Sequence, residues 1–313
     1  MNVLVVPSNR ADRIEQFCKE WNGHFDRIVV VEDGPKKTFN ISCDHYSWNE
    51  IEEEMGEDNW IISRKDSAIR SFGFLMAKKH DPDHIFTLDD DCSPIGNDFV
   101  EKHIEAMSNT PKWMMPADRR TRGVPYRNVG RCPNIALNMG MWKGVPDLNA
   151  IQALSGENWE LEDMETKIIP ANQYFPLCGM NLCFKPWILP LMYFPLMGEG
   201  QPYRRFDDIW CGVILKRVCD HLHESISYGP PYIRHQRLSD PLSNLKKEAS
   251  GIVENEYFWE EIDRIILLGK TYEECMNEIG EHLSNNEEEY YRKLGEAIKI
   301  WVKYSGTFSS ESD

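Results

Sequence analysis

The sequence lacks any long, uninterrupted apolar run, although 41% of its 313 residues are hydrophobic. Charged side chains such as Arg10, Glu15 and Lys19 interrupt the first twenty-five residues, so no secretory signal is expected there. The longest apolar stretch outside the expected strands, residues 187–197, contains two prolines and is too short to cross a bilayer. We therefore expect a soluble protein without a transmembrane segment.

Paired cysteines are also missing. The chain has nine cysteines, an odd number, and none of them forms a Cys-x-x-Cys pair. This pattern argues against a disulfide framework and against a structural zinc site. The reducing cytoplasm is therefore the expected location.

Positive charge is scarce, with 35 Lys and Arg residues against 51 Asp and Glu residues and a formal net charge of −16. Nucleic acid is an unfavourable partner for such a chain, because phosphate backbones are bound by clustered Lys and Arg. An anionic ligand would need local cations, either basic side chains or a metal ion, to overcome the long-range repulsion.

Two nucleotide-binding signatures are absent as well. No Gly-x-Gly-x-x-Gly follows an expected strand, and no Gly-x4-Gly-Lys-[Ser/Thr] loop occurs. The sequence therefore indicates neither a flavin nor a nicotinamide (NAD) cofactor.

What the sequence does contain is an alternation of short apolar runs and helical patterns in its first ninety residues. Continuous apolar runs at 3–7, 28–31 and 85–88 predict strands that are buried on both faces. Between them we expect one helix with an apolar stripe at Ile14, Phe17, Cys18 and Trp21, and another from Asp66 or Ser67 to about Lys79. This order is typical of α/β proteins with a mostly parallel sheet, which bind ligands at the carboxyl ends of the strands.

Three consecutive carboxylates, Asp89, Asp90 and Asp91, end the third of these strands. Neighbouring carboxylates repel one another and lose hydration on burial, and a divalent cation would relieve both costs. Asp89 and Asp91 would share one hard metal if the backbone stays extended, and the metal would bridge them to a diphosphate. The alternative is an acidic turn that caps a following helix.

A second acidic pair, Asp207 and Asp208, is framed by Phe206, Ile209 and Trp210. Burial among such side chains raises a carboxyl pKa and suits it to general acid or base work, or to orienting a sugar hydroxyl. The alternative is the first turn of a helix. His235 ends another expected strand, where a metal role and a purely structural role both stay open.

Several basic residues could hold phosphate groups, although each could equally be a solvated surface residue. Arg70 is favoured, because its helix carries it beside the acidic strand end. The full set is Arg10, Lys65, Arg70, Arg122, Arg127, Arg131, Arg204 and Arg205.

After residue 251 the chain becomes charged and helical, so we expect a catalytic unit at 1–250 and a helical segment at 251–313. Two apolar stripes mark its helices. The first stripe is Phe258, Ile262, Ile265 and Ile266, and the second is Leu294, Ala297, Ile298 and Trp301. They could pack on their own chain or on a second copy in a homo-oligomer, since periodicity does not distinguish the two.

Several segments, taken in order, resemble the reversibly glycosylated polypeptides of plants, the UDP-arabinopyranose mutases. They are Lys-Asp-Ser-Ala at 65–68, Asp-Asp-Asp-Cys at 89–92, Pro-Leu-Cys-Gly-Met-Asn-Leu at 176–182, Leu-Met-Gly-Glu-Gly-Gln-Pro at 196–202, Phe-Asp-Asp-Ile-Trp at 206–210, Pro-Tyr-Ile-x-His at 231–235 and Asn-Leu-Lys-Lys-Glu at 244–248. The resemblance covers roughly residues 3–250 in the family's order, which makes it more specific than any one motif.

The resemblance implies a GT-A-type, Rossmann-like nucleotide-sugar-binding fold with a C-terminal helical extension and a requirement for Mn²⁺ or Mg²⁺. It also implies flavin-independent interconversion of UDP-arabinopyranose and UDP-arabinofuranose. The site residues expected on this basis are Arg122, Asp207 and Asp208 for catalysis; Pro7, Ser8, Arg10, Asp33, Lys65, Asp66, Arg70 and Asp90 for the UDP-sugar; and Asp89, Asp91 and His235 for the metal.

The family carries an arginine that becomes reversibly glycosylated in an Arg-Gly-x-Pro context, which Arg122 matches, and its next arginine would be Arg127 or Arg131. A guanidinium remains protonated and has no lone pair to offer, so we expect Arg122 to contact sugar or phosphate first and to act covalently only second. Two rival functions remain: a glycosyltransferase of the same fold, and a silent partner that binds nucleotide sugar without turnover.

Overall fold

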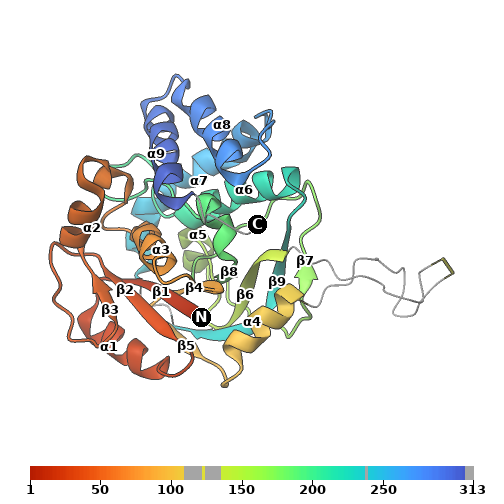
Figure 1. Cartoon of the computed structure of the whole chain (residues 1–313). Helices are drawn as coiled ribbons and strands as arrows, with labels where there is room; N and C mark the ends of the chain where they lie inside the picture. The colour runs from red at the N-terminus through yellow and green to blue at the C-terminus, as the bar shows by residue number, and fades with distance from the viewer. Residues whose placement is uncertain (109–121, 124–134, 237–238, 307–313) are drawn as a thin grey trace, which may run out of the picture.

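The computed structural model describes residues 1–108, 122–123, 135–236 and 239–306, and all structural statements below refer to these residues (Figure 1). The strands are β1 (Asn2–Ser8), β2 (Arg27–Glu32), β3 (Asp44–Tyr46), β4 (His84–Leu88), β5 (Cys92–Pro94), β6 (Ile135–Gly144), β7 (Lys167–Ile168), β8 (Asn181–Phe184) and β9 (Ser225–His235). The α-helices are α1 (Ala11–Glu20), α2 (Trp48–Met55), α3 (Arg70–Lys78), α4 (Phe99–Ser108), α5 (Ala150–Leu154), α6 (Asp207–His221), α7 (Pro241–Asp263), α8 (Tyr272–Ser284) and α9 (Glu289–Ser305). Short 3-10 turns occur at η1 (Gly56–Ile61), η2 (Ser67–Ile69) and η3 (Pro186–Leu191).

The three apolar runs predicted as strands are confirmed as β1, β2 and β4, and the two predicted helices are confirmed as α1 and α3. Asp66 is the N-cap of the second helical segment, because its side chain accepts a hydrogen bond from the backbone N–H of Ala68 at 3.3 Å. Helix α3 lies very close to the sheet at Gly73. A Cβ atom there would lie 2.4 Å from Val5 Cγ1, so a larger residue would push the helix away.

The sheet is mixed, so the prediction of a mostly parallel sheet is wrong. The strand order is β3-β2-β1-β4-β8-β6-β9-β5, with β7 paired to β9. Four pairs are parallel: β1–β2, β2–β3, β1–β4 and β6–β9. Four pairs are antiparallel: β4–β8, β6–β8, β5–β9 and β7–β9. The alternating pattern that predicted parallel pairing occurs only in the first ninety residues, and the strands added later come from segments without it.

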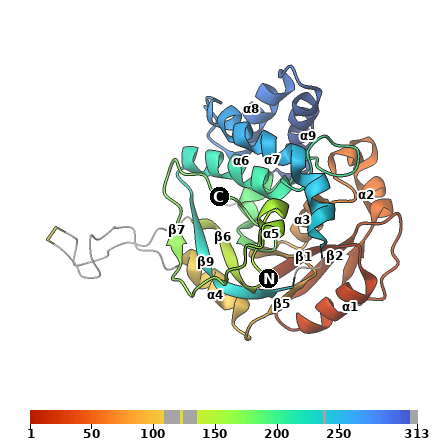
Figure 2. The same ribbon diagram turned by 180° about the vertical axis from the view of Figure 1, so that it is seen from behind.

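Helices cover both faces of the sheet (Figures 1 and 2). Helices α1 and α4 lie on one face, where the rings of Trp21 and Phe99 meet edge to face with centroids 4.8 Å apart. Helices α3 and α6 lie on the other face, and α7, α8 and α9 form a further layer outside α6.

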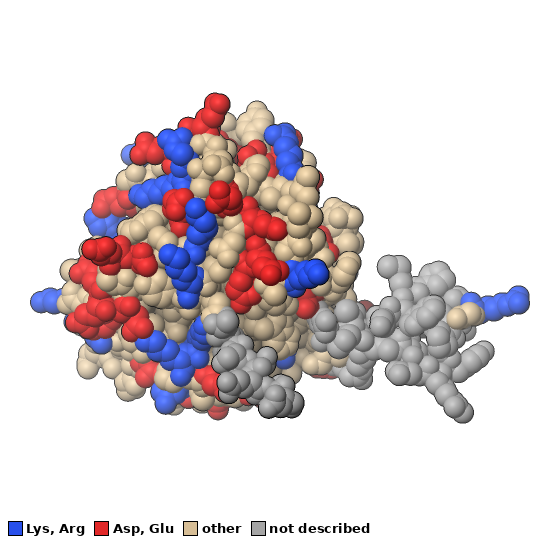
Figure 3. Space-filling model, turned by 45° about the horizontal axis from the view of Figure 1, so that its top comes forward, with Lys and Arg blue, Asp and Glu red and all other residues tan. Residues whose placement is uncertain are grey.

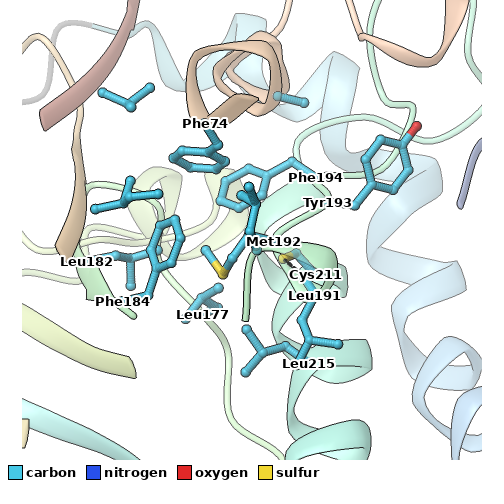
Figure 4. Close-up of a cluster of buried hydrophobic side chains, with 14 of the residues drawn as sticks. Phe74, Leu177, Leu182, Phe184, Leu191, Met192, Tyr193, Phe194, Cys211 and Leu215 are labelled. Atoms are coloured by element: carbon cyan, nitrogen blue, oxygen red, sulfur yellow. Dashed lines mark hydrogen bonds between the residues drawn. The ribbon is translucent and has the colours of Figure 1, made fainter. Parts of the chain in front are cut away.

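A cluster of apolar side chains joins α3, β8, η3 and α6 (Figure 4). Phe74 of α3 packs edge to face on Phe184 of β8, with ring centroids 5.2 Å apart. The ring centroids of Phe74 and Phe194 are 5.9 Å apart. Cys211 and Leu215 of α6 point into the same cluster, and both are fully buried. This packing fixes the beginning of α6, and hence Asp207 and Asp208, against the sheet.

The two C-terminal stripes pack on their own chain. The ring of Trp210 stacks on Phe258 of α7 at 3.9 Å, and the indole N–H of Trp301 in α9 donates to the carbonyl of Pro190. The prediction that Ile266 belongs to the first stripe is wrong. Its side chain is 79% exposed, because α7 ends at Asp263 and the helical period does not continue beyond that residue.

Helix α7 runs through residue 250, where the sequence predicted that the catalytic unit ends, and the proposed division into two units stays a prediction. Within the described ranges, no helix has both the length and the apolar character needed to span a membrane. The surface agrees with the acidic composition, since Figure 3 shows acidic side chains in several clusters with basic ones between them.

A buried polar network ties together β6, β8 and β9. Neutral His103 of α4 accepts from Asn138 Nδ2 at 2.8 Å through Nδ1 and donates to Asn181 Oδ1 at 3.0 Å through Nε2. Asn181 in turn donates to the carbonyls of Met141 and Pro231. Burial lowers the pKa of His103 to about 3, so the ring stays neutral.

We expect His103→Leu to lower the free energy of unfolding by about 2 kcal/mol, because Asn181 Oδ1 is left buried without its donor. The contribution of His103 should be complete above about pH 6.5, the pKa of an unfolded histidine, and decrease as pH falls toward 3. Urea unfolding at several pH values measures both effects, with the half-buried His24→Leu as control. Equal urea midpoints for His103→Leu and wild type at pH 7.5 would contradict this account.

Candidate active site

A cavity of about 950 Å³ opens at the carboxyl ends of the parallel strands. Its wall includes Pro7 and Ser8 at the end of β1, Asp33 just after β2, and His235 at the end of β9. The acidic triplet follows β4 and lines the same cavity. This position agrees with the rule that open α/β sheets bind ligands beyond the carboxyl ends of their strands.

The triplet forms a turn rather than an extended strand, since the N–H of Cys92 donates to the carbonyl of Asp89 at 3.1 Å. The extended backbone that was the condition for a metal shared by Asp89 and Asp91 is therefore not present, although both residues line the cavity. Buried Asp90 is held internally: Ser8 Oγ donates to it at 2.5 Å and Arg10 forms a two-pronged ion pair with it.

The two outer carboxylates of the triplet have different surroundings. Burial acts to raise the pKa of Asp89, but the Arg70 guanidinium pairs with this carboxylate and lowers the pKa overall. Burial and the charge of Asp89 raise the pKa of Asp91 to about 6. The nearest cation to Asp91 is Arg10, whose Nη2 lies 3.7 Å from Asp91 Oδ2.

His235 presents one ring nitrogen as an acceptor. Its Nδ1 lies 2.8 Å from the carbonyl oxygen of Val145, and a carbonyl can only accept, so Nδ1 carries the proton. In the neutral ring, Nε2 then has no proton and could bind a metal ion, and a ligating histidine usually donates its other ring N–H to a carbonyl in this way. Among the described residues, however, no three His, Cys, Asp or Glu side chains converge closely enough to hold a metal by themselves.

Asp33 organises the turn that carries Lys65 and Asp66. Its carboxylate accepts hydrogen bonds from the backbone N–H groups of Lys65 and Asp66, both at 2.9 Å, and from the indole N–H of Trp48. Lys65 adopts a left-handed backbone conformation with φ of 57°, which is uncommon outside glycine. All three predicted ligand contacts, Asp33, Lys65 and Asp66, line the cavity.

Asp207 and Asp208 begin α6 and face the same cavity, so the acidic pair is both a helix first turn and part of the cavity wall. Burial, followed by the charge of Asp66, raises the pKa of Asp207 to about 7. Burial, followed by the charge of Asp207, raises the pKa of Asp208 to about 8. Asp208 accepts from the N–H of Gly179 at 3.0 Å, which holds the carboxyl in place.

Sequence reasoning missed Asp147 and Cys178. Asp147 lies in the loop after β6, lines the cavity, and accepts a hydrogen bond from the Cys178 thiol at 3.2 Å. Cys178 immediately precedes Gly179, so Asp147 and Asp208 bind neighbouring groups of one segment. No strand end or acidic run marks Asp147 in the sequence, and only its contacts identify it.

The sequence model of the family described as reversibly glycosylated polypeptide matches residues 2–310. The chain belongs to the reversibly glycosylated polypeptide family. The resemblance predicted from the motifs is thereby confirmed.

Three proteins with similar sequences carry the name of an enzyme. A probable UDP-arabinopyranose mutase 1 of Solanum tuberosum is 35% identical over 337 residues, which cover 96% of this chain and 88% of the relative. UDP-arabinopyranose mutase 1 of Arabidopsis thaliana is 34% identical, with coverage of 96% and 90%. UDP-arabinopyranose mutase 1 of Oryza sativa subsp. japonica is 33% identical, with coverage of 96% and 89%.

Two residues predicted for the site do not line the cavity. Arg70 is 1% exposed, and its guanidinium donates to Ser67 O, Thr87 Oγ1, Gly179 O and Asp89, so it reaches the site only through Asp89. Arg122 is exposed and lies outside the cavity wall, so its catalytic role stays a prediction. The alternatives Arg127 and Arg131 lie outside the described residues.

Proposed function

We propose that this chain interconverts UDP-arabinopyranose and UDP-arabinofuranose without a flavin, on a fold of the GT-A type. Relatives named UDP-arabinopyranose mutase match 96% of its length. The observation that carries the proposal is that one cavity joins the Asp89–Asp91 turn and His235 to two carboxyl groups of raised pKa, Asp207 and Asp208.

We further propose that Asp89, Asp91 and His235 would hold Mn²⁺ or Mg²⁺. The donor set fits such an ion, because carboxylate oxygens suit hard divalent cations and the Val145 carbonyl holds the proton of a neutral His235 on Nδ1, which leaves Nε2 for the metal. Since no three such side chains among the described residues converge on one point by themselves, we expect the ion to bind together with the substrate rather than alone. When bound, the ion would neutralise negative charge on the diphosphate.

The chain's own residues would then position the sugar and move its protons. Ring contraction requires the bond between UDP and the anomeric carbon to break and the ring to open, with the old ring oxygen taking up a proton. A different hydroxyl then loses its proton and closes on that carbon, and the UDP oxygen bonds to the carbon again. Asp208, with a pKa of about 8, keeps its proton at neutral pH and is suited to donate it to a sugar oxygen. Asp207, with a pKa of about 7, is suited to take up or release a proton at the same pH.

The decisive experiment is turnover without an acceptor. We expect the purified protein, incubated with UDP-arabinopyranose and Mn²⁺ alone, to produce UDP-arabinofuranose that chromatography separates from the substrate. Only an isomerase forms this product without an acceptor, so conversion would exclude a glycosyltransferase and a silent partner. Absence of the furanose product from folded protein that binds UDP would refute the mutase proposal. Addition of EDTA should abolish turnover if a divalent ion is required.

The cysteines support the proposed cytoplasmic location. All the cysteines in the described part of the chain are free, from Cys18 to Cys275. Cys18 and Cys43 lie with their sulfur atoms 3.3 Å apart and remain unbonded. Free thiols at this spacing are expected to persist in a reducing compartment.

A further inference from the structure

We propose that Arg204, supported by Lys247, forms a diphosphate-binding wall in the cavity that the Asp89–Asp91 turn also lines. Both cations line the cavity. The inference deepens the proposed function, since it rests on a nucleoside diphosphate sugar as the ligand and names the side chains that would neutralise its phosphates. It also moves the phosphate contact away from Arg70, which the sequence favoured.

Five basic residues line the cavity, and acidic partners occupy three of them. Arg10 pairs with Asp90, Lys65 with Glu199, and Arg205 with Glu248. Within the part of the chain that the structure describes, Arg204 and Lys247 form no ion pair, so these two cations are left for a ligand.

Arg204 carries an unsatisfied donor. Its Nη2 donates to the carbonyl of Lys65 at 3.3 Å, but its Nε is buried and has no acceptor among the described residues. A buried N–H group of a cation without an acceptor is costly, and such groups in native proteins call for an explanation such as a missing ligand. An oxygen of a phosphate group is a suitable acceptor, because arginine binds phosphates through several N–H donors at once.

The backbone around Arg204 is held in uncommon conformations. Arg205 has φ of 68° and Lys65 has φ of 57°, both in the left-handed region that non-glycine residues rarely adopt. The segments that contain Arg205 and Lys65 lie side by side. Arg204 donates a hydrogen bond to the carbonyl of Lys65, and the backbone N–H of Glu199 donates to the carbonyl of Arg64 at 3.2 Å. Such conformations persist where the surroundings enforce them, and they cluster at ligand-binding sites.

The surroundings that enforce this conformation come from α7. Glu248 accepts from Arg205 Nε at 2.8 Å and from the N–H of Ala150 at 2.7 Å, and it is buried. Gly251 allows α7 to press against the ring of Phe206, since a Cβ there would lie 2.5 Å from Phe206 Cδ2. Lys247 lies on the same helix, so the contacts that fix Arg205 also place the second free cation at the cavity.

A diphosphate needs local positive charge in order to bind to this acidic protein. With a net charge of −16, the chain repels a diphosphate at long range, and the acidic turn repels it locally unless a cation intervenes. Arg204 and Lys247 supply positive charge that does not depend on a metal. We therefore expect part of the UDP affinity to remain when divalent ions are removed.

The test is the binding of UDP, uridine and inorganic pyrophosphate to folded wild type and Arg204→Gln, measured by calorimetry at fixed salt with Mn²⁺ and with EDTA. We expect Arg204→Gln to weaken UDP and pyrophosphate about 10- to 100-fold, the effect of losing a charged hydrogen bond, and to leave uridine unchanged. The matched control is Arg217→Gln. Arg217 also has a buried Nε without an acceptor and donates to one carbonyl, Ile265 O, but it lies outside the cavity wall.

Equal UDP affinity in wild type and Arg204→Gln would overturn the inference, as would an equal loss in Arg217→Gln, which would indicate a general effect on folding. A wild type that binds neither UDP nor pyrophosphate would overturn it together with the proposed function. A wild type that binds both through Arg204 but does not convert UDP-arabinopyranose would refute only the mutase proposal, so the two failures are distinguishable.

Discussion

Asp208→Asn is expected to reduce mutase turnover by about 100- to 10,000-fold while leaving UDP binding nearly unchanged. Asparagine has the shape of the protonated carboxyl and keeps an acceptor for the Gly179 N–H, but it cannot transfer a proton. In the wild type, kcat should fall as pH rises through about 8, because Asp208 then loses the proton that it must donate. Chromatographic turnover between pH 6 and 9.5 measures both effects, and calorimetry with UDP measures binding.

The Asp208→Asn substitution, which lowers turnover, should not lower the stability of the fold. The pKa of Asp208 is raised from 3.8 to about 8 in the folded protein, so between these values the folded state binds more protons than the unfolded state. The carboxyl group therefore makes the fold less stable as pH rises from about 4 to 8. Asp208→Asn avoids this cost and should be at least as stable as wild type at pH 8 in thermal unfolding.

The control for this prediction is Asp163→Asn, which removes a carboxylate that is 86% exposed and lies outside the cavity wall. It should leave both turnover and its pH profile unchanged. Asp147→Asn gives a further readout, because the charge of Asp147 contributes to the raised pKa of Asp208. Removing it should shift the fall in kcat to lower pH. An Asp208→Asn enzyme with wild-type kcat would show that Asp208 moves no proton in the reaction.

Asp91→Asn is expected to lower the Mn²⁺-dependent affinity for UDP by about 100-fold or more. Even the loss of a residue that only supports a metal ligand costs about 10- to 100-fold, so loss of a ligand should cost at least as much. The protein should still fold normally, because Asp91 is crowded by Asp89 and its carboxylate has weak partners among the described residues: Arg10 at 3.7 Å and the Cys92 thiol at 4.0 Å. Calorimetry with UDP in Mn²⁺ and in EDTA measures the effect.

Asp89→Asn should behave differently, although it removes the other proposed carboxylate ligand. Asp89 neutralises Arg70, whose side chain is only 2% exposed, so its loss leaves a buried charge without its partner. We expect a decrease of roughly 3 kcal/mol in the free energy of unfolding, near the lower end for broken buried pairs because Asp89 is partly exposed. Wild-type UDP affinity of Asp91→Asn in Mn²⁺, or equal stability of Asp89→Asn, would contradict the roles assigned to these residues.

The predicted site agrees with the structure where a residue follows a recognisable strand or helix signal. The acidic triplet could be located because it follows the apolar run of β4, and His235 because it ends β9. Asp33 follows β2 in the same way. Strand ends of this sheet meet at one edge, so their residues lie together even when they are far apart in the sequence.

The differences between the predicted site and the structure have specific causes. The sequence favoured Arg70 as a phosphate contact because its helix carries it beside the acidic strand end. The close approach of α3 to the sheet, however, buries the guanidinium among protein acceptors. Arg204 could not be preferred to the other arginines, because its free Nε results from a pairing pattern that involves Lys65, Arg205 and Glu248. Asp147 has no local signal, since it lies in a loop that only the fold brings beside Cys178.

The sequence by itself determined the family, strands β1, β2 and β4, helices α1 and α3, and the set of carboxylates at the strand ends, because these depend on local periodicity and on residue order. Only the tertiary structure decided the mixed pairing of the sheet, the raised pKa values of Asp207 and Asp208, and which cations remain free in the cavity. Burial and ion pairing are properties of residues that are distant in the chain, so they arise only when the fold brings those residues together.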